Sequence, residues 1–138
     1  MAREYVEKNT AEMVRCLKEL VAIPGIFEDA PSKGAPFGKN IQKSLEYVLR
    51  MGQQMGFQVK NYDGYAGEGN RMIGILCHTD VVSAGEGWNT DPFDPVEKDG
   101  KLYGRGTSDD KGPLVSSLFA MKYLADNQLI PKDTCLRM

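Results

Sequence analysis

The sequence predicts an α/β fold arranged as one domain over residues 1–138. Two stretches near the start space their apolar residues at helical intervals. A nearly continuous apolar run of strand length follows, which is typical of a strand covered on both faces in a sheet flanked by helices. A length of 138 residues suits a single domain with its own core.

The first half is predicted to hold two amphipathic helices and a short strand. The first helix covers about Arg3–Ala22, and Pro24 stops it because proline disfavours helical geometry in the residue before it. The second helix covers about Lys39–Met55 and ends at Gly56. The stretch Phe57–Asn61 then reads as a short strand.

The apolar run Arg71–Cys77 is predicted to be a strand covered on both faces. Its carboxyl end delivers His78 and Asp80. In open α/β sheets, active sites form beyond the carboxyl ends of strands, so this position already indicates a functional site.

A hairpin, a third helix and a last strand are predicted after this run. Val96–Lys98 and Lys101–Tyr103 flank Asp99-Gly100, a strong signal for a two-residue turn. A helix begins at Pro113, where the missing N–H is harmless, and reaches about Asn127. The stretch Thr134–Met138 has the pattern of a strand.

Composition excludes several classes of partner. The formal net charge of −2 gives no electrostatic footprint for nucleic acid or an anionic membrane surface. No apolar run approaches the ~20 residues needed to cross a bilayer, and no secretory signal is apparent. The three cysteines are odd in number and far apart, which favours reduced thiols in a cytoplasmic protein.

The candidate site consists of His78, Asp80 and Asp109. In extended chain, residues i and i+2 point to the same side, so His78 and Asp80 can face one cavity. His78 can bind a metal through one ring nitrogen while Asp80 holds the proton on the other. The carboxylate of Asp109 has enough lone pairs to bridge two cations.

Other interpretations compete with each motif taken alone. A histidine beside an acid is usually a surface pair, and the run Asp109–Gly112 alone is usually a solvated turn. A phosphate-binding loop is excluded because it requires Gly-Lys followed by Ser or Thr, and here the lysine precedes the glycine. Trp88, Phe93 and Tyr103 are expected to be packing residues, with a place in a substrate pocket as the alternative. The two motifs together, at a strand end and a helix entry, favour the metal site.

These motifs strongly resemble the di-zinc peptidase family of aminoacylases, carnosinases and glutamate carboxypeptidases. Within that family, the chain is most similar to the dipeptidase V and Xaa-His dipeptidase group. The resemblance covers essentially the whole chain and is most specific in 74–113. It is carried by Gly74–Val82, Gly87–Phe93, Asp99–Gly106 and Ser108–Pro113.

The resemblance implies a fold, a cofactor and residue roles. The fold is the N-terminal half of a zinc-peptidase catalytic domain, with a mixed sheet flanked by helices. His78 ligates one zinc, Asp80 is the catalytic aspartate that orients it, and Asp109 bridges both zincs. Cobalt or manganese could replace zinc. The peptide bond between Asp109 and Asp110 is expected to be cis.

The resemblance also implies that part of the site lies outside this chain. The family's glutamate pair, a further acidic ligand, a distal histidine and the lid domain have no counterpart here. We therefore expect the complete parent to hydrolyse dipeptides with a free amino terminus, and the 138-residue piece to be metal-free and inactive by itself. An uncovered strand edge would favour self-association of the piece.

Two alternatives stay open. An aminoacylase or deacetylase of the same family would use the same residues on N-acyl amino acids. A non-catalytic assembly module would keep the fold without the chemistry, although nothing would then require His78, Asp80 and Asp109 together.

Overall fold

The computed structural model describes residues 1–29, 35, 37–59 and 71–138. In chain order these form α1 (Ala2–Val21), α2 (Lys39–Gln54), β1 (Arg71–Gly74), β2 (Val96–Lys98), β3 (Lys101–Tyr103), α3 (Lys111–Asp126) and β4 (Thr134–Arg137). The predicted α/β class is confirmed. Within the described ranges, the parallel and antiparallel strand pairs form two separate two-stranded sheets.

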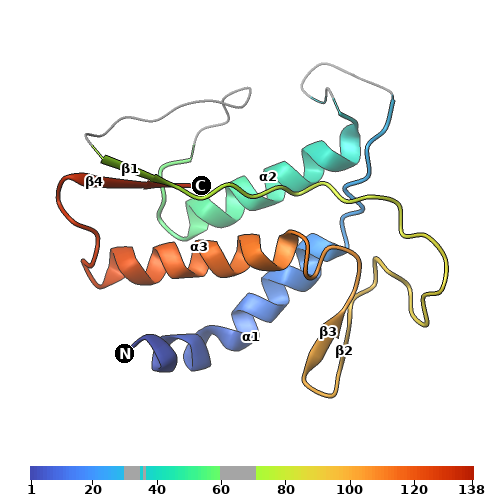
Figure 1. Cartoon of the computed structure of the whole chain (residues 1–138), viewed down its shortest axis with the longest axis horizontal. Coiled ribbons are helices and arrows are strands. Elements are labelled where there is room, and N and C mark those ends of the chain that lie inside the picture. Colours follow the sequence, from blue (N-terminus) through green and yellow to red (C-terminus); the bar gives the residue numbers. More distant parts are fainter. Residues whose placement is uncertain (30–34, 36, 60–70) are drawn as a thin grey trace.

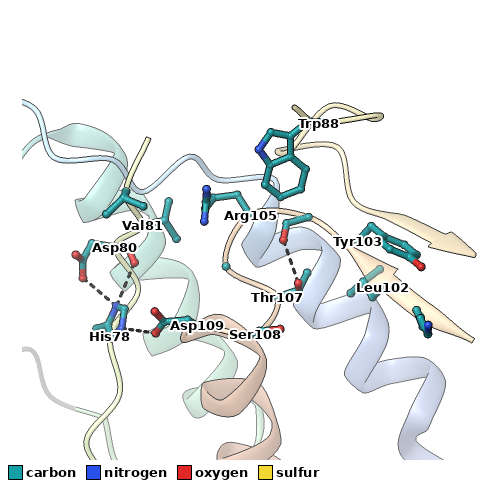
Figure 2. A pocket seen from close by; sticks show the side chains of 14 residues that line it. His78, Asp80, Val81, Trp88, Leu102, Tyr103, Arg105, Thr107, Ser108 and Asp109 are labelled. Atoms are coloured by element: carbon teal, nitrogen blue, oxygen red, sulfur yellow. Dashed lines mark hydrogen bonds and ion pairs between the residues drawn. The ribbon is translucent and has the colours of Figure 1, made fainter. Parts of the chain in front are cut away.

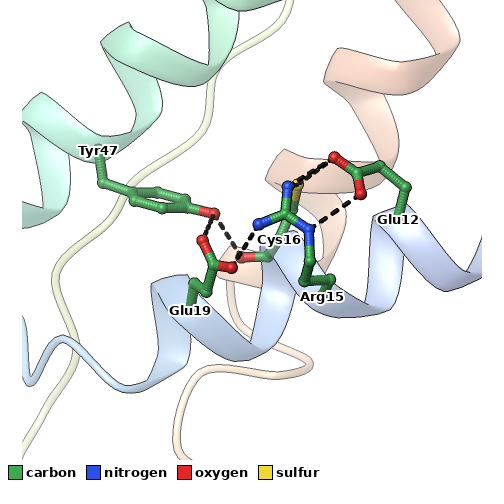
Figure 3. Close-up of polar contacts among 5 residues, drawn as sticks. All are labelled: Glu12, Arg15, Cys16, Glu19 and Tyr47. Atoms are coloured by element: carbon green, nitrogen blue, oxygen red, sulfur yellow. Dashed lines mark hydrogen bonds and ion pairs between the residues drawn. The ribbon is translucent and has the colours of Figure 1, made fainter.

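The helices pack on one another and enclose the core (Figure 1). α1 packs mainly on α3, and the buried side chains at its C-terminal end include Leu20 and Val21. α2 is joined to α1 by its tyrosine, because the Tyr47 hydroxyl donates to the Glu19 carboxylate at 3.0 Å (Figure 3). Arg15 holds Glu19 from the other side. The central cluster is Cys16, Leu20, Met51, Leu114, Val115, Leu118 and Phe119.

The two strand pairs have different roles in the fold. β1 and β4 run parallel, with Arg71 opposite Thr134 and Gly74 opposite Arg137. β2 and β3 form the predicted hairpin, with the predicted bounds. The turn residue Asp99 has φ 52° and Gly100 has φ 70°, which is why this pair of residue types suits the turn.

Three expectations about elements need correction. Residues 57–59 form no strand, and residues 60–61 lie outside the described part. β1 stops at Gly74, although the Ile75 N–H still donates to the Arg137 carbonyl at 2.7 Å. α3 starts at Lys111 and not at Pro113, which the first turn tolerates because its N–H groups have no partner within the helix.

β1 is not covered on both faces in the described part of the chain, so that prediction was wrong there. Met72 is 57% exposed and Leu76 is 99% exposed, whereas the thiol of Cys77 packs against the helical core. The helices lie against one side of this segment. Its large apolar side chains are therefore covered on that side only. One side of this segment is therefore open, and self-association of the chain through it stays a prediction. None of the described helices has the length and apolarity to span a membrane.

Replacing Leu118 by alanine should lower the free energy of unfolding by about 2–5 kcal/mol, because the side chain is 5% exposed within the core cluster. The matched control is Leu129→Ala, since Leu129 is 54% exposed, and it should change stability by less than about 0.5 kcal/mol. Urea denaturation followed by circular dichroism measures both. Equal losses for the two variants would contradict the core assignment.

Candidate metal centre

The segment that follows β1 presents His78 and Asp80 on one side. Burial alternates along it: Thr79 is half-buried and Val81 is 7% exposed, whereas the side chains of His78 and Asp80 are 49% and 58% exposed. The extended backbone therefore turns the odd positions toward the helices and the even positions outward. This is the arrangement that the His-x-Asp spacing predicted.

Asp109 reaches the same place from the loop before α3 (Figure 2). Its Oδ1 lies 3.1 Å from His78 Nε2. On the other side of the ring, His78 Nδ1 lies 3.1 Å from the Asp80 carbonyl oxygen and 3.3 Å from Asp80 Oδ1. The peptide bond between Asp109 and Asp110 is cis, as the resemblance implied. The structure thus brings the three predicted residues together.

Oxygen acceptors face both ring nitrogens of His78: those of Asp80 face Nδ1, and the Asp109 carboxylate faces Nε2. A neutral ring that keeps its proton on Nδ1 has its Nε2 lone pair directed at Asp109 Oδ1. Two acceptors in contact need a positive charge between them, either a proton or a metal ion.

The spacing of this donor pair fits a metal ion. Two ligands on one tetrahedral zinc, each about 2.0–2.1 Å from the metal, lie about 3.3 Å apart. The separation of His78 Nε2 and Asp109 Oδ1 is 3.1 Å. Within the described ranges, no group of three or more His, Cys, Asp or Glu side chains is arranged to hold a metal. The described residues therefore offer a donor pair at ligand spacing and no complete set of metal ligands.

The carboxylates raise the pKa of His78. Burial lowers this pKa, but the hydrogen bond to Asp109, the backbone of Asp80 and the charges of both carboxylates outweigh it. The net pKa lies above the ordinary value of 6.5. A metal ion that binds at Nε2 must therefore compete with a proton that the same carboxylates stabilise.

Asp110 supports the site in a way that the sequence pattern did not reveal. It is the N-cap of α3, yet its side chain makes no capping bond to that helix. Its Oδ2 instead accepts the backbone N–H of His78 at 3.1 Å. The two adjacent aspartates therefore hold the histidine at two atoms, one on the ring and one on the backbone.

A hollow of about 620 Å³ opens beside His78 and Asp109. Trp88 and Tyr103, which were expected to be packing residues, line its wall together with Arg105 (Figure 2). The guanidinium of Arg105 lies 5.4 Å from the centre of the Trp88 ring and donates to the Ala84 carbonyl at 2.9 Å. A hollow of this size with aromatic and charged walls suits a small ligand.

In the described part of the chain, a histidine and two aspartates from separate segments meet beside a hollow. Residues 74–136 match the Peptidase family M20/M25/M40. The chain belongs to this family.

Relatives and a solved structure agree with this family. The chain is 38% identical over 139 positions to "Putative dipeptidase YtjP" of Bacillus subtilis (strain 168), which covers 96% of the chain and 30% of the relative. It is 39% identical over 132 positions to "Putative dipeptidase SAUSA300_1697" of Staphylococcus aureus (strain USA300), covering 91% and 28%. The structure of human carnosine dipeptidase 1 superposes with a TM-score of 0.75 at 27% identity, covering 96% of this chain and 32% of that one. The chain thus spans less than a third of the length of these proteins.

The pKa of His78 should be measurable without interference, because it is the only histidine of the 138 residues. In the metal-free chain, NMR titration of its ring protons should give a pKa above 6.5, and Asp109→Asn should lower it by removing a hydrogen bond and a charge. Since the folded pKa is the higher one, the stability that this protonation contributes is present below pH 6.5 and is lost as the pH rises through the folded pKa.

The control for this titration is Asp94→Asn, which changes an exposed aspartate outside the site and should leave the pKa of His78 in place. A His78 pKa at or below 6.5, or one that does not respond to Asp109→Asn, would contradict the described contacts.

Proposed function

We propose that the complete protein carrying this chain is a zinc-dependent dipeptidase that acts on dipeptides with a free amino terminus. The observation that carries the proposal is the contact of His78 Nε2 with the Asp109 carboxylate at 3.1 Å, a spacing at which one cation can bind both atoms. The family membership and the dipeptidase names of the relatives support this assignment.

Each of the three residues has a defined part in the proposal. His78 binds one metal through Nε2, and Asp80 fixes the tautomer and orientation of the ring through Nδ1–H. Asp109 would hold the metal ions through its carboxylate oxygens, which have enough lone pairs for two cations. When bound, the zinc pair would polarise the scissile carbonyl and lower the pKa of a water toward ~7.

The hollow next to the metal ligands supplies space for the substrate. Its volume of about 620 Å³ lies within the range of small-ligand pockets, which is ~300–1,000 Å³. The proton released by the attacking water needs an acceptor, and the family resemblance assigns this role to a glutamate outside the 138 residues. We place the protein in the cytoplasm, a location supported by its three free cysteines.

The test uses the complete protein that carries this chain, and not the 138 residues alone. His78→Ala and Asp109→Ala should each abolish zinc retention after dialysis, measured by atomic absorption, because each removes a ligand. Asp94→Ala is the matched control and should retain zinc as the unsubstituted protein does. Full zinc content in either ligand variant would contradict the metal assignment.

Asp80→Ala should behave differently from the ligand variants. The loss of the ring's hydrogen-bond partner should lower kcat or zinc affinity about 10–100-fold while some zinc remains bound. Unchanged kcat and zinc affinity would remove Asp80 from the mechanism.

Substrate class is decided by a panel of dipeptides with free amino termini and N-acetyl amino acids on the same preparation. Preferential cleavage of the dipeptides supports the proposal. Preferential cleavage of the N-acetyl compounds would make the protein an aminoacylase, and zinc binding with no cleavage of either class would favour the assembly module.

A further inference from the structure

The ammonium of Lys111 is enclosed in the structure directly behind the candidate metal centre. The residue is 0% exposed, and its Nζ donates to the carbonyl oxygens of Leu20 at 2.9 Å and Ile23 at 2.7 Å. The Leu20 carbonyl belongs to the last turn of α1, the negative end of that helix dipole, and the Ile23 carbonyl lies in the turn just after it. Burial lowers the pKa of Lys111 to about 8, while the charge of Asp80 raises it.

The turn that accepts hydrogen bonds from Lys111 also contacts the segment that carries His78 and Asp80. The carbonyl of Gly25 accepts the N–H of Val81 at 2.8 Å. A Cβ on Gly25 would lie 2.7 Å from the carbonyl oxygen of Thr79, so only a glycine allows this approach. Thr79 stands between the two site residues, and its position therefore sets theirs.

The loop before Asp109 lies directly against the segment of His78 and Asp80 at Gly106, and the stem of Lys111 lies beside the same glycine. Gly106 has φ +89°, and a Cβ there would lie 2.9 Å from Val81 Cγ1 and 3.2 Å from Lys111 Cδ. The stem of the lysine thus fills the space under the aspartate loop, while its charged end reaches the turn of residues 20–25. Lys111 thus joins the aspartate loop to the turn of residues 20–25, and Gly25 and Gly106 both lie against the segment that carries His78 and Asp80.

We propose that Lys111 is a positioning residue of the candidate metal centre: its hydrogen bonds to the carbonyls of Leu20 and Ile23 fix the Asp109 loop at the same turn that contacts the segment of His78 and Asp80. The separation of His78 from Asp109 then depends on this shared support. This inference rests on the proposed metal-dependent hydrolase function and adds a residue that contacts neither metal nor substrate.

The test compares Lys111→Met with Lys122→Met in the complete protein. Methionine keeps an unbranched stem but removes the charge and the donors. Lys122 lies on the same helix and pairs with Asp126 away from the site, which makes it the matched control. Lys111→Met should lower zinc affinity about 10–100-fold and lower kcat with KM unchanged, as loss of ligand orientation does. It should also alter the visible spectrum of the cobalt-substituted protein, whereas Lys122→Met should change none of these.

A second variant and a metal-free measurement keep the inference testable. Gly25→Ala disturbs the same turn from the other side and should reproduce the loss of zinc affinity, even if Lys111→Met fails to fold. Hydrogen exchange of the metal-free protein should be faster at the Val81 amide in each folded variant of this pair. Wild-type zinc affinity and kcat in folded Lys111→Met, or in Gly25→Ala, would overturn the inference. If the unsubstituted protein neither binds zinc nor cleaves dipeptides, the proposed function fails, and exchange at Val81 still decides the role of Lys111.

Discussion

An imidazole lone pair and a carboxylate oxygen cannot face each other at contact distance unless a positive charge lies between them. His78 Nε2 and Asp109 Oδ1 are placed in this way when the ring proton is on Nδ1, next to Asp80. In the proposed function, a proton and a metal ion are alternatives at this point. Every functional statement about this chain depends on that pairing.

Local patterns predicted the helices, the hairpin and part of the site. The hairpin bounds agree because Asp99-Gly100 adopts positive φ readily, which leaves little freedom in the register of the flanking strands. His78 and Asp80 share a side because extended backbone has a period of two, a property of the chain itself. Local patterns could not predict their contact with Asp109, which lies 31 positions from His78. That contact was expected from the two motifs together and from the family resemblance.

Other features depend on contacts between distant segments, and local patterns cannot show them. Lysine is almost never fully buried unless it is paired, so Lys111 in a glycine-framed loop reads as solvated until its carbonyl partners are known. The backbone contact of Asp110 with His78 is hidden for the same reason. The apolar run after Arg71 predicted burial on both faces because it reports hydrophobicity only, and it carries no information about which neighbours the described chain provides.

The hydrogen bonds of Lys111 join residues that are 91 and 88 positions apart. Neither helix formation nor a nearby turn can bring such distant groups together, so this connection exists only when α1 and α3 are already packed on each other. Opening the packing between these helices must then disperse the candidate site at the same time. The arrangement of the candidate site and the packing of α1 on α3 are therefore expected to be lost in the same unfolding step.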